Sequence, residues 1–154
     1  MYARINSLGL LGLNAFPVTV EIESSEGLES FDIVGMADIS VKESRERIRS
    51  AFRSSGINFP EARVLVNLAP ADVKKTGAVH DLAIAVSVLR IMGISNDAYM
   101  QKSVFIGEVA LNGEIRAVQG VLPMTIMAKE NGMEPVAHAV DIVTIRASNH
   151  SLPS

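Results

Sequence analysis

Alternating apolar and polar positions in the first half of the chain predict β-strands. Val18, Val20 and Ile22 alternate with polar residues, which is typical of a strand with one buried face. Residues 9–14 contain glycine and asparagine and interrupt the pattern, so a turn is expected there. We expect strands over 2–8, 16–23, 31–34 and 63–68.

Three longer segments have the patterns of helices. Residues 81–92 are apolar nearly all round, which indicates a buried helix. Another helix is expected to begin at a cap on Asp38 or Ser40 and to run to about residue 55. A third is expected over 121–131. In the capped helix the predicted buried stripe consists of Val41, Ile48, Ala51 and Phe52.

Residues 104–123 predict a β-hairpin that leads into a helix. Two alternating apolar runs flank Asn112-Gly113, and this dipeptide supplies the two positive-φ residues of a type I′ turn. The second strand then passes through Gln119-Gly120 into the expected helix. The hairpin is therefore predicted to position the start of that helix.

These elements, about six strands and three helices, predict a mixed fold. An antiparallel hairpin favours the α+β class, with a mixed sheet and helices packed on it, although α/β with helices against one sheet face stays open. Residues 93–102 are expected to form a link without regular structure. We expect one domain over 1–135, followed over 136–154 by a last strand at 142–145 and a tail that frays.

The composition excludes several classes of site. The chain has 154 residues and can bury one substantial aliphatic core. Its net charge of −3 means that nucleic-acid binding would need a local patch. The lack of cysteine excludes disulfides and thiolate metal sites, and it fits a cytoplasmic location. No membrane span or signal peptide is recognisable.

Sequence motifs for phosphate binding and nucleophilic catalysis are incomplete. Lys74-Lys75-Thr76-Gly77 lacks the preceding glycines of a phosphate-binding loop, so a solvated polar loop is expected. Ser40 and Ser44 share a helix with Lys42, but residues two apart on a helix point in different directions. No Ser-Lys dyad is therefore predicted within this helix.

The histidines lack the spacing of a metal site. His80 precedes Asp81 at a helix start, where capping or partial burial explains both residues better than catalysis does. No cofactor is expected in this chain. The three histidines are His80, His138 and His150.

Four cations are predicted to line one strip of the first helix. Their spacing of three and four residues places them on one side, where like charges repel weakly. The strip is either a solvated face or a docking strip for phosphates or for acidic residues of a neighbouring domain. We call it the basic strip: Lys42, Arg45, Arg49 and Arg53.

Several motifs in a fixed order resemble one bacterial family. The segments are L-G-L at 11–13, S-F-D-I-V-G-M-A at 30–37, V-K-E-S-R-E-R-I-R at 41–49, V-N-L-A-P-A-D at 66–72, D-L-A-I-A at 81–85 and the hairpin segment at 105–123. Together they resemble the N-terminal domain of magnesium-chelatase-like AAA+ ATPases of the YifB/ComM group, with Ala83 where that family has a proline. The resemblance covers residues 1–132.

The resemblance implies a fold like domain 2 of ribosomal protein S5, which the proteolytic domain of Lon protease shares. Lon places a catalytic serine where this chain has Val79 and a catalytic lysine where it has Leu122. Neither aliphatic side chain can attack a carbonyl or move a proton. The resemblance therefore implies a domain without peptidase activity.

The family continues into an ATPase module that this sequence lacks, so we expect a fragment or shortened form. ATP and Mg²⁺ are expected only for that module. The resemblance implies a hexameric parent that couples ATP hydrolysis to DNA branch migration in recombination and natural transformation. This domain's expected partners are its own ATPase module, neighbouring subunits and DNA, but no membrane. The alternatives are a pure oligomerisation module and a degenerate Lon-type peptidase.

Overall fold

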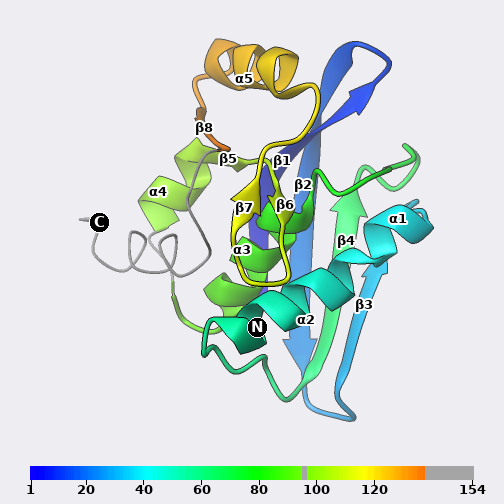
Figure 1. Ribbon diagram of the computed structural model, residues 1–154, viewed down its shortest axis with the longest axis vertical. Coiled ribbons are helices and arrows are strands. Elements are labelled where there is room, and N and C mark those ends of the chain that lie inside the picture. Colours follow the sequence, from blue (N-terminus) through cyan, green and yellow to red (C-terminus); the bar gives the residue numbers. More distant parts are fainter. Residues whose placement is uncertain (95–96, 138–154) are drawn as a thin grey trace.

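A mixed β-sheet forms the centre of the computed structural model, which describes residues 1–94 and 97–137 (Figure 1). The strands pair in the order β3-β4-β2-β1-β5-β8. β2 is antiparallel to β1 and β4, and the other pairings are parallel. The strands are β1 (Tyr2–Leu11), β2 (Asn14–Ser25), β3 (Ser30–Val34), β4 (Arg63–Ala69), β5 (Ser103–Phe105) and β8 (Glu134–Val136).

Helices pack on both faces of this sheet, which confirms the α+β class. α2 and α3 cover one face, where Ile5 and Val20 join the larger core cluster. Leu8 points to the other face, because side chains alternate along a strand, and packs with Met124 and Ala128 of α5. The helices are α1 (Ile39–Lys42), α2 (Ser44–Ser54), α3 (Asp81–Ile91), α4 (Asp97–Lys102) and α5 (Val121–Glu130).

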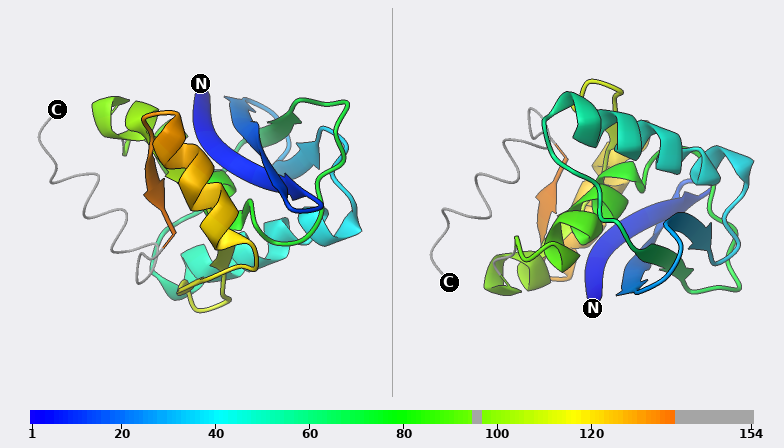
Figure 2. Two further views of the ribbon diagram at one scale, coloured as in Figure 1. Left: turned by 90° about the horizontal axis from the view of Figure 1, so that it is seen from above. Right: turned by 90° about the horizontal axis from the view of Figure 1, so that it is seen from below.

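The first helix of the prediction is divided into α1 and α2, which run end to end in Figure 2. Asp38 is the cap, since its carboxylate accepts a hydrogen bond from the Val41 N–H at 3.0 Å. Glu43 separates the two helices but keeps helical dihedral angles. The predicted stripe of Val41, Ile48, Ala51 and Phe52 is confirmed, since all four are fully buried.

The first two strands extend further than predicted. Residues 9–11 pair with 14–16, so the expected turn shrinks to Gly12-Leu13, with φ of 64° at the glycine. Gly9 lies within β1, where the Phe16 ring occupies the space that a side chain would fill. A Cβ at this position would lie 2.7 Å from Phe16 Cζ. The glycine therefore serves close packing within the strand.

The Asn-Gly hairpin forms, but its strands and turn differ from the prediction. Residues 103–105 belong to the main sheet, and the hairpin contains only β6 (Glu108–Val109) and β7 (Ile115–Arg116). Gly113 has a φ of 92°, whereas Asn112 is not in the positive-φ region, so the type I′ turn was wrong. Instead the Ala110 N–H donates to the Glu114 carbonyl at 2.8 Å, which closes a three-residue loop over residues 111–113, and the Gly113 N–H donates back to the Ala110 carbonyl at 2.9 Å.

Two further elements were not predicted. α4 lies within 93–102, where no regular structure was expected, and its Tyr99 ring packs edge-on against Phe105 at 6.3 Å. β8 extends the sheet beside β5. The strand predicted at 142–145 lies outside the described residues.

Candidate functional site

Asp81 lies at a buried junction of three of the sequence motifs. Its carboxylate is fully buried and accepts hydrogen bonds from the Ser44 hydroxyl, from Arg47 Nε at 2.6 Å and Nη2 at 2.9 Å, and from the Val109 N–H at 3.1 Å. Ser44 and Arg47 come from the motif at 41–49, and Val109 from the hairpin motif. We call this group the Asp81 junction: Ser44, Arg47, Asp81 and Val109.

The Asp81 junction is a buried ion pair in which the carboxylate already accepts four hydrogen bonds. The hydrogen bonds that Arg47 donates to Asp81 raise the pKa of Arg47 although partial burial opposes this, so the guanidinium stays charged. Every polar atom of the carboxylate is engaged by the body of the protein, which leaves no lone pair directed at a substrate. Breaking such a buried pair is costly, so the junction fixes α2, α3 and the hairpin relative to one another.

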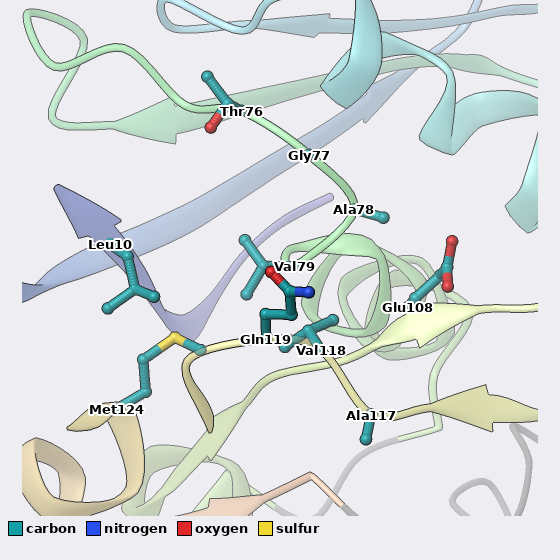
Figure 3. A pocket seen from close by; sticks show the side chains of 10 residues that line it. All are labelled: Leu10, Thr76, Gly77, Ala78, Val79, Glu108, Ala117, Val118, Gln119 and Met124. Atoms are coloured by element: carbon teal, nitrogen blue, oxygen red, sulfur yellow. The ribbon is translucent and has the colours of Figure 1, made fainter. Parts of the chain in front are cut away.

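An open cleft lies next to this junction, between residues 76–79 and 117–119 (Figure 3). It has a volume of about 450 Å³. The two walls are linked through the start of the hairpin, because the Gly107 N–H donates to the Val79 carbonyl at 3.1 Å. The lining residues are Leu10, Thr76, Gly77, Ala78, Val79, Glu108, Ala117, Val118, Gln119 and Met124.

The cleft contains one of the two positions that the sequence resemblance matches to the catalytic residues of Lon. Val79 lines it, but Leu122 does not and has 67% of its surface exposed. The polar side chains of the cleft are Thr76, Glu108 and Gln119. This set offers hydrogen-bonding groups for a ligand. Among the residues lining the cleft there is no lysine or histidine to activate the Thr76 hydroxyl as a nucleophile.

α5 is positioned against the cleft by a glycine at its start. Gly120 has a φ of 79°, and a Cβ there would lie 2.0 Å from Leu10 Cδ1. Leu10 at the far end of β1 therefore packs directly on the backbone at this turn. The left-handed conformation favours glycine, and a Cβ would fit only if the Leu10 side chain shifted.

Two residues of the loop before α3 are more buried than predicted. Lys75 is 1% exposed, and its Nζ donates to the Gly35 carbonyl at 2.8 Å and to the Pro70 carbonyl. The prediction of a solvated loop is therefore wrong at Lys75. Burial lowers its pKa, against the attraction of Asp72. The amine holds the turns after β3 and β4 together.

His80 is also buried and has a polar partner. It is 1% exposed, and its Nδ1 lies 3.0 Å from the Ser7 hydroxyl. Burial, with a smaller contribution from the Lys75 charge, lowers the pKa of His80 to about 4. The ring is therefore neutral at pH 7. His80 is more completely buried than the predicted partial burial.

The structure separates the four cations of the basic strip into two kinds. Arg45 donates to the Phe31 carbonyl at 3.3 Å and lies 3.7 Å from the Asp32 carboxylate. Arg49 instead lies over the rings of Phe31 and Phe59. Lys42 and Arg53 are exposed. The strip is therefore partly bound to its own domain and partly open.

The Asp81 junction could have been suspected from one signal in the sequence. Ser44 is three residues after Val41 and four before Ile48, so it interrupts the apolar stripe of α2. A polar residue on a buried stripe needs a partner. Neither Arg47 nor Asp81 was predicted as that partner, because the contact depends on tertiary structure.

The described part of the chain contains no group of three acidic or histidine side chains placed to hold a metal ion. None of its helices is long and apolar enough to cross a membrane. The other two histidines of the sequence, His138 and His150, lie outside the described residues.

Comparison with known proteins assigns the chain to a family. Residues 20–140 match the model of ChlI, subunit ChlI of Mg-chelatase, so the chain belongs to this family. It is similar to YifB of Salmonella typhimurium, with 39% identity over 120 residues, which are 78% of this chain and 24% of that protein. It is also similar to competence protein ComM of Haemophilus influenzae, with 36% identity over 132 residues, or 86% and 26% of the two chains.

These similarities confirm the resemblance to the YifB/ComM group of magnesium-chelatase-like proteins. The chain spans about a quarter of the length of the relatives it matches.

Proposed function

We propose that this chain is the non-catalytic, Lon-like N-terminal domain of a cytoplasmic magnesium-chelatase-like AAA+ ATPase. In this proposal the parent is a hexamer that couples ATP hydrolysis to DNA branch migration in recombination and natural transformation. ATP and Mg²⁺ act in the ATPase module, and this domain contributes contacts to neighbouring subunits and to DNA. Its fold is that of domain 2 of ribosomal protein S5.

One observation carries the non-catalytic part of the proposal. The cleft at the protease-like position presents Val79 where a nucleophile would stand, while the strongest polar contacts nearby are buried at Asp81. The hairpin leading into α5 supports the Lon-like fold. Membership of the ChlI family and similarity to a competence protein support the parent's class.

The basic strip supports the contact with DNA. Lys42 and Arg53 lie exposed on one side of α1 and α2, and Arg49 is available between them. Phosphate contacts release counterions, so affinity should fall steeply as salt rises. The test is fluorescence anisotropy of a labelled DNA duplex with this chain between about 50 and 200 mM salt. Binding that is absent at low salt, or insensitive to salt, would contradict the DNA part.

A pure oligomerisation module is the second candidate, because several leucines are exposed. Leu11 and Leu13 at the tip of the first hairpin are 68% and 90% exposed, and Leu122 of α5 is 67% exposed. Apolar groups at a surface are typical of contacts with another subunit. Sedimentation analysis of the chain with and without Leu13→Ser and Leu122→Ser separates this candidate from DNA binding, since those changes should alter assembly alone.

A further inference from the structure

The end of α2 carries a concave surface with two arginines and an aromatic ring. Its volume is about 310 Å³. It lies on the side of α2 opposite the Asp81 junction, because Arg49 and Arg47 point to different flanks of the helix. We call it the arginine pocket: Arg49, Arg53, Gly56, Ile57, Asn58 and Phe59.

Arg49 is held in place by aromatic rings and leaves its donors open. Its guanidinium carbon lies 5.0 Å from the centroid of Phe59 and 5.7 Å from that of Phe31, and the two rings are 4.9 Å apart. Stacking uses the face of the guanidinium, while its N–H groups lie in the plane of the group. A ligand would therefore meet a donor set that is already oriented.

The arginines of the pocket differ from their neighbours in having no acidic partner. Arg45 pairs with Asp32 and Arg47 with Asp81, whereas no ion pair joins Arg49 or Arg53 to an acid among the described residues. No carboxylate lines the pocket. Two uncompensated guanidinium groups on a concave surface favour an anion.

The donor set selects the class of anion. Each guanidinium can donate two parallel N–H bonds, and the Asn58 amide at the rim supplies further donors. A carboxylate has two oxygens and would satisfy one guanidinium. A DNA phosphodiester also has two free oxygens, but the group repeats along the backbone, so neighbouring phosphates can meet both guanidinium groups.

The geometry points to the arginine pocket as a phosphate-binding site, which takes neighbouring backbone phosphates of DNA. This assignment rests on the proposed function for the source of the phosphate. It also divides the basic strip, because Arg49 and Arg53 carry the binding while Arg45 stabilises the domain. Lys42 lies near the start of the same helical segment and contributes as a point charge.

Two titrations of the 154-residue chain test the assignment. The first follows the arginine Nε–H resonances by NMR while pyrophosphate is added, and the second follows anisotropy of a labelled DNA duplex as salt is varied. In wild type we expect the Arg49 and Arg53 resonances to shift. In Arg49→Gln/Arg53→Gln we expect DNA affinity to fall about tenfold or more at low salt and the salt slope to decrease by about 2.

Matched variants control for charge and folding. Arg63→Gln removes the same charge from β4, outside the pocket, and should change DNA affinity by less than about threefold. Arg53→Gln alone leaves the stacking of Arg49 on the aromatic rings intact, so it should fold even if the double variant does not. This single variant should lose part of the DNA affinity. Arg53→Lys keeps the charge but loses the planar group that donates two parallel hydrogen bonds, so it should bind phosphate more weakly than wild type.

The outcomes distinguish failure of the pocket from failure of the proposed function. If wild type binds DNA with a steep salt slope but the Arg49 and Arg53 variants bind equally well, the pocket is overturned and DNA binding stands. If pyrophosphate shifts both arginines but DNA does not bind, the pocket stands with another phosphate source, and the proposed DNA contact fails. If neither ligand shifts the two resonances, the pocket is overturned.

Discussion

Val79 and Asp81 flank the same histidine, yet their surroundings differ completely. Val79 faces an open cleft, whereas Asp81 is fully buried and accepts hydrogen bonds from α2 and the hairpin. The sequence motifs meet at Asp81. The family motifs that meet here therefore form a structural contact between elements. What the neighbouring cleft can do depends on the side chains that line it.

The largest expected effect comes from removing the charge of Asp81. Asp81→Asn should lower the free energy of unfolding by about 3 kcal/mol, because the Arg47 guanidinium loses its charged partner. Urea denaturation measures the change. Glu26→Gln in the exposed loop after β2 is the control and should have little effect. A loss at Asp81 no larger than that of the control would remove the distinction between the two regions.

His80, between the two regions, should make stability depend on pH. Its pKa is about 4 in the fold and about 6.5 when unfolded, so the unfolded state binds more protons between these values. Stability should fall as pH drops below about 6.5, by about 2 kcal/mol at pH 5. Urea denaturation of wild type and His80→Gln at pH 7.5 and pH 5 checks this.

In His80→Gln this part of the pH dependence should disappear, while changes due to carboxylates remain in both proteins. Equal loss of stability in the two proteins between pH 7.5 and pH 5 would show that the ring is not held neutral.

A smaller effect is expected where α5 meets the cleft. Gly120→Ala should destabilise by about 1 to 2 kcal/mol, because it combines positive φ with a contact that Leu10 must shift to relieve. Gly132→Ala is a matched control, since it has a φ of 70° but open space around the new methyl group. Thermal unfolding should rank Gly120→Ala as the more damaging change. The reverse ranking would mean that Leu10 does not pack on this turn.

The smallest effect is expected at Val79 itself. Val79→Ser places a hydroxyl in the cleft, and it should change stability by less than about 1 kcal/mol because Val79 is only half-buried. No labelling by a fluorophosphonate probe is expected, since no lysine or histidine lines the cleft to activate the serine. Labelling of either wild type or this variant would revive the peptidase alternative.

Local patterns were enough to predict much of the fold. The apolar stripe of α2 and the nearly uniform apolar sequence of α3 identified both helices, because burial follows helical periodicity. α4 was missed because a short polar segment has no such period. The turn type at Asn112-Gly113 was wrong because the dipeptide also suits a three-residue loop. In that loop the Leu111 carbonyl accepts hydrogen bonds from two serines of α2.

The polar contacts could not be predicted in the same way. Lys75 was expected in solvent, but its amine donates to the Pro70 carbonyl nearby and to the Gly35 carbonyl, which is 40 residues away in the sequence. Arg47 and Asp81 are far apart in sequence, and only the packing of α2 on α3 brings them together. The basic strip was recognised as a row of like charges. The structure was needed to separate Arg45, which pairs with Asp32, from Arg49, which lies over aromatic rings.

The central claim is that Asp81 joins the family motifs into a structural unit through Arg47. A double-mutant cycle with Arg47→Met and Asp81→Asn, measured by urea denaturation at pH 7.5, tests it most directly. We predict a coupling free energy of about 2 kcal/mol, so that the double variant loses clearly less stability than the two single losses together. Additive losses, within about 0.5 kcal/mol, would contradict the claim.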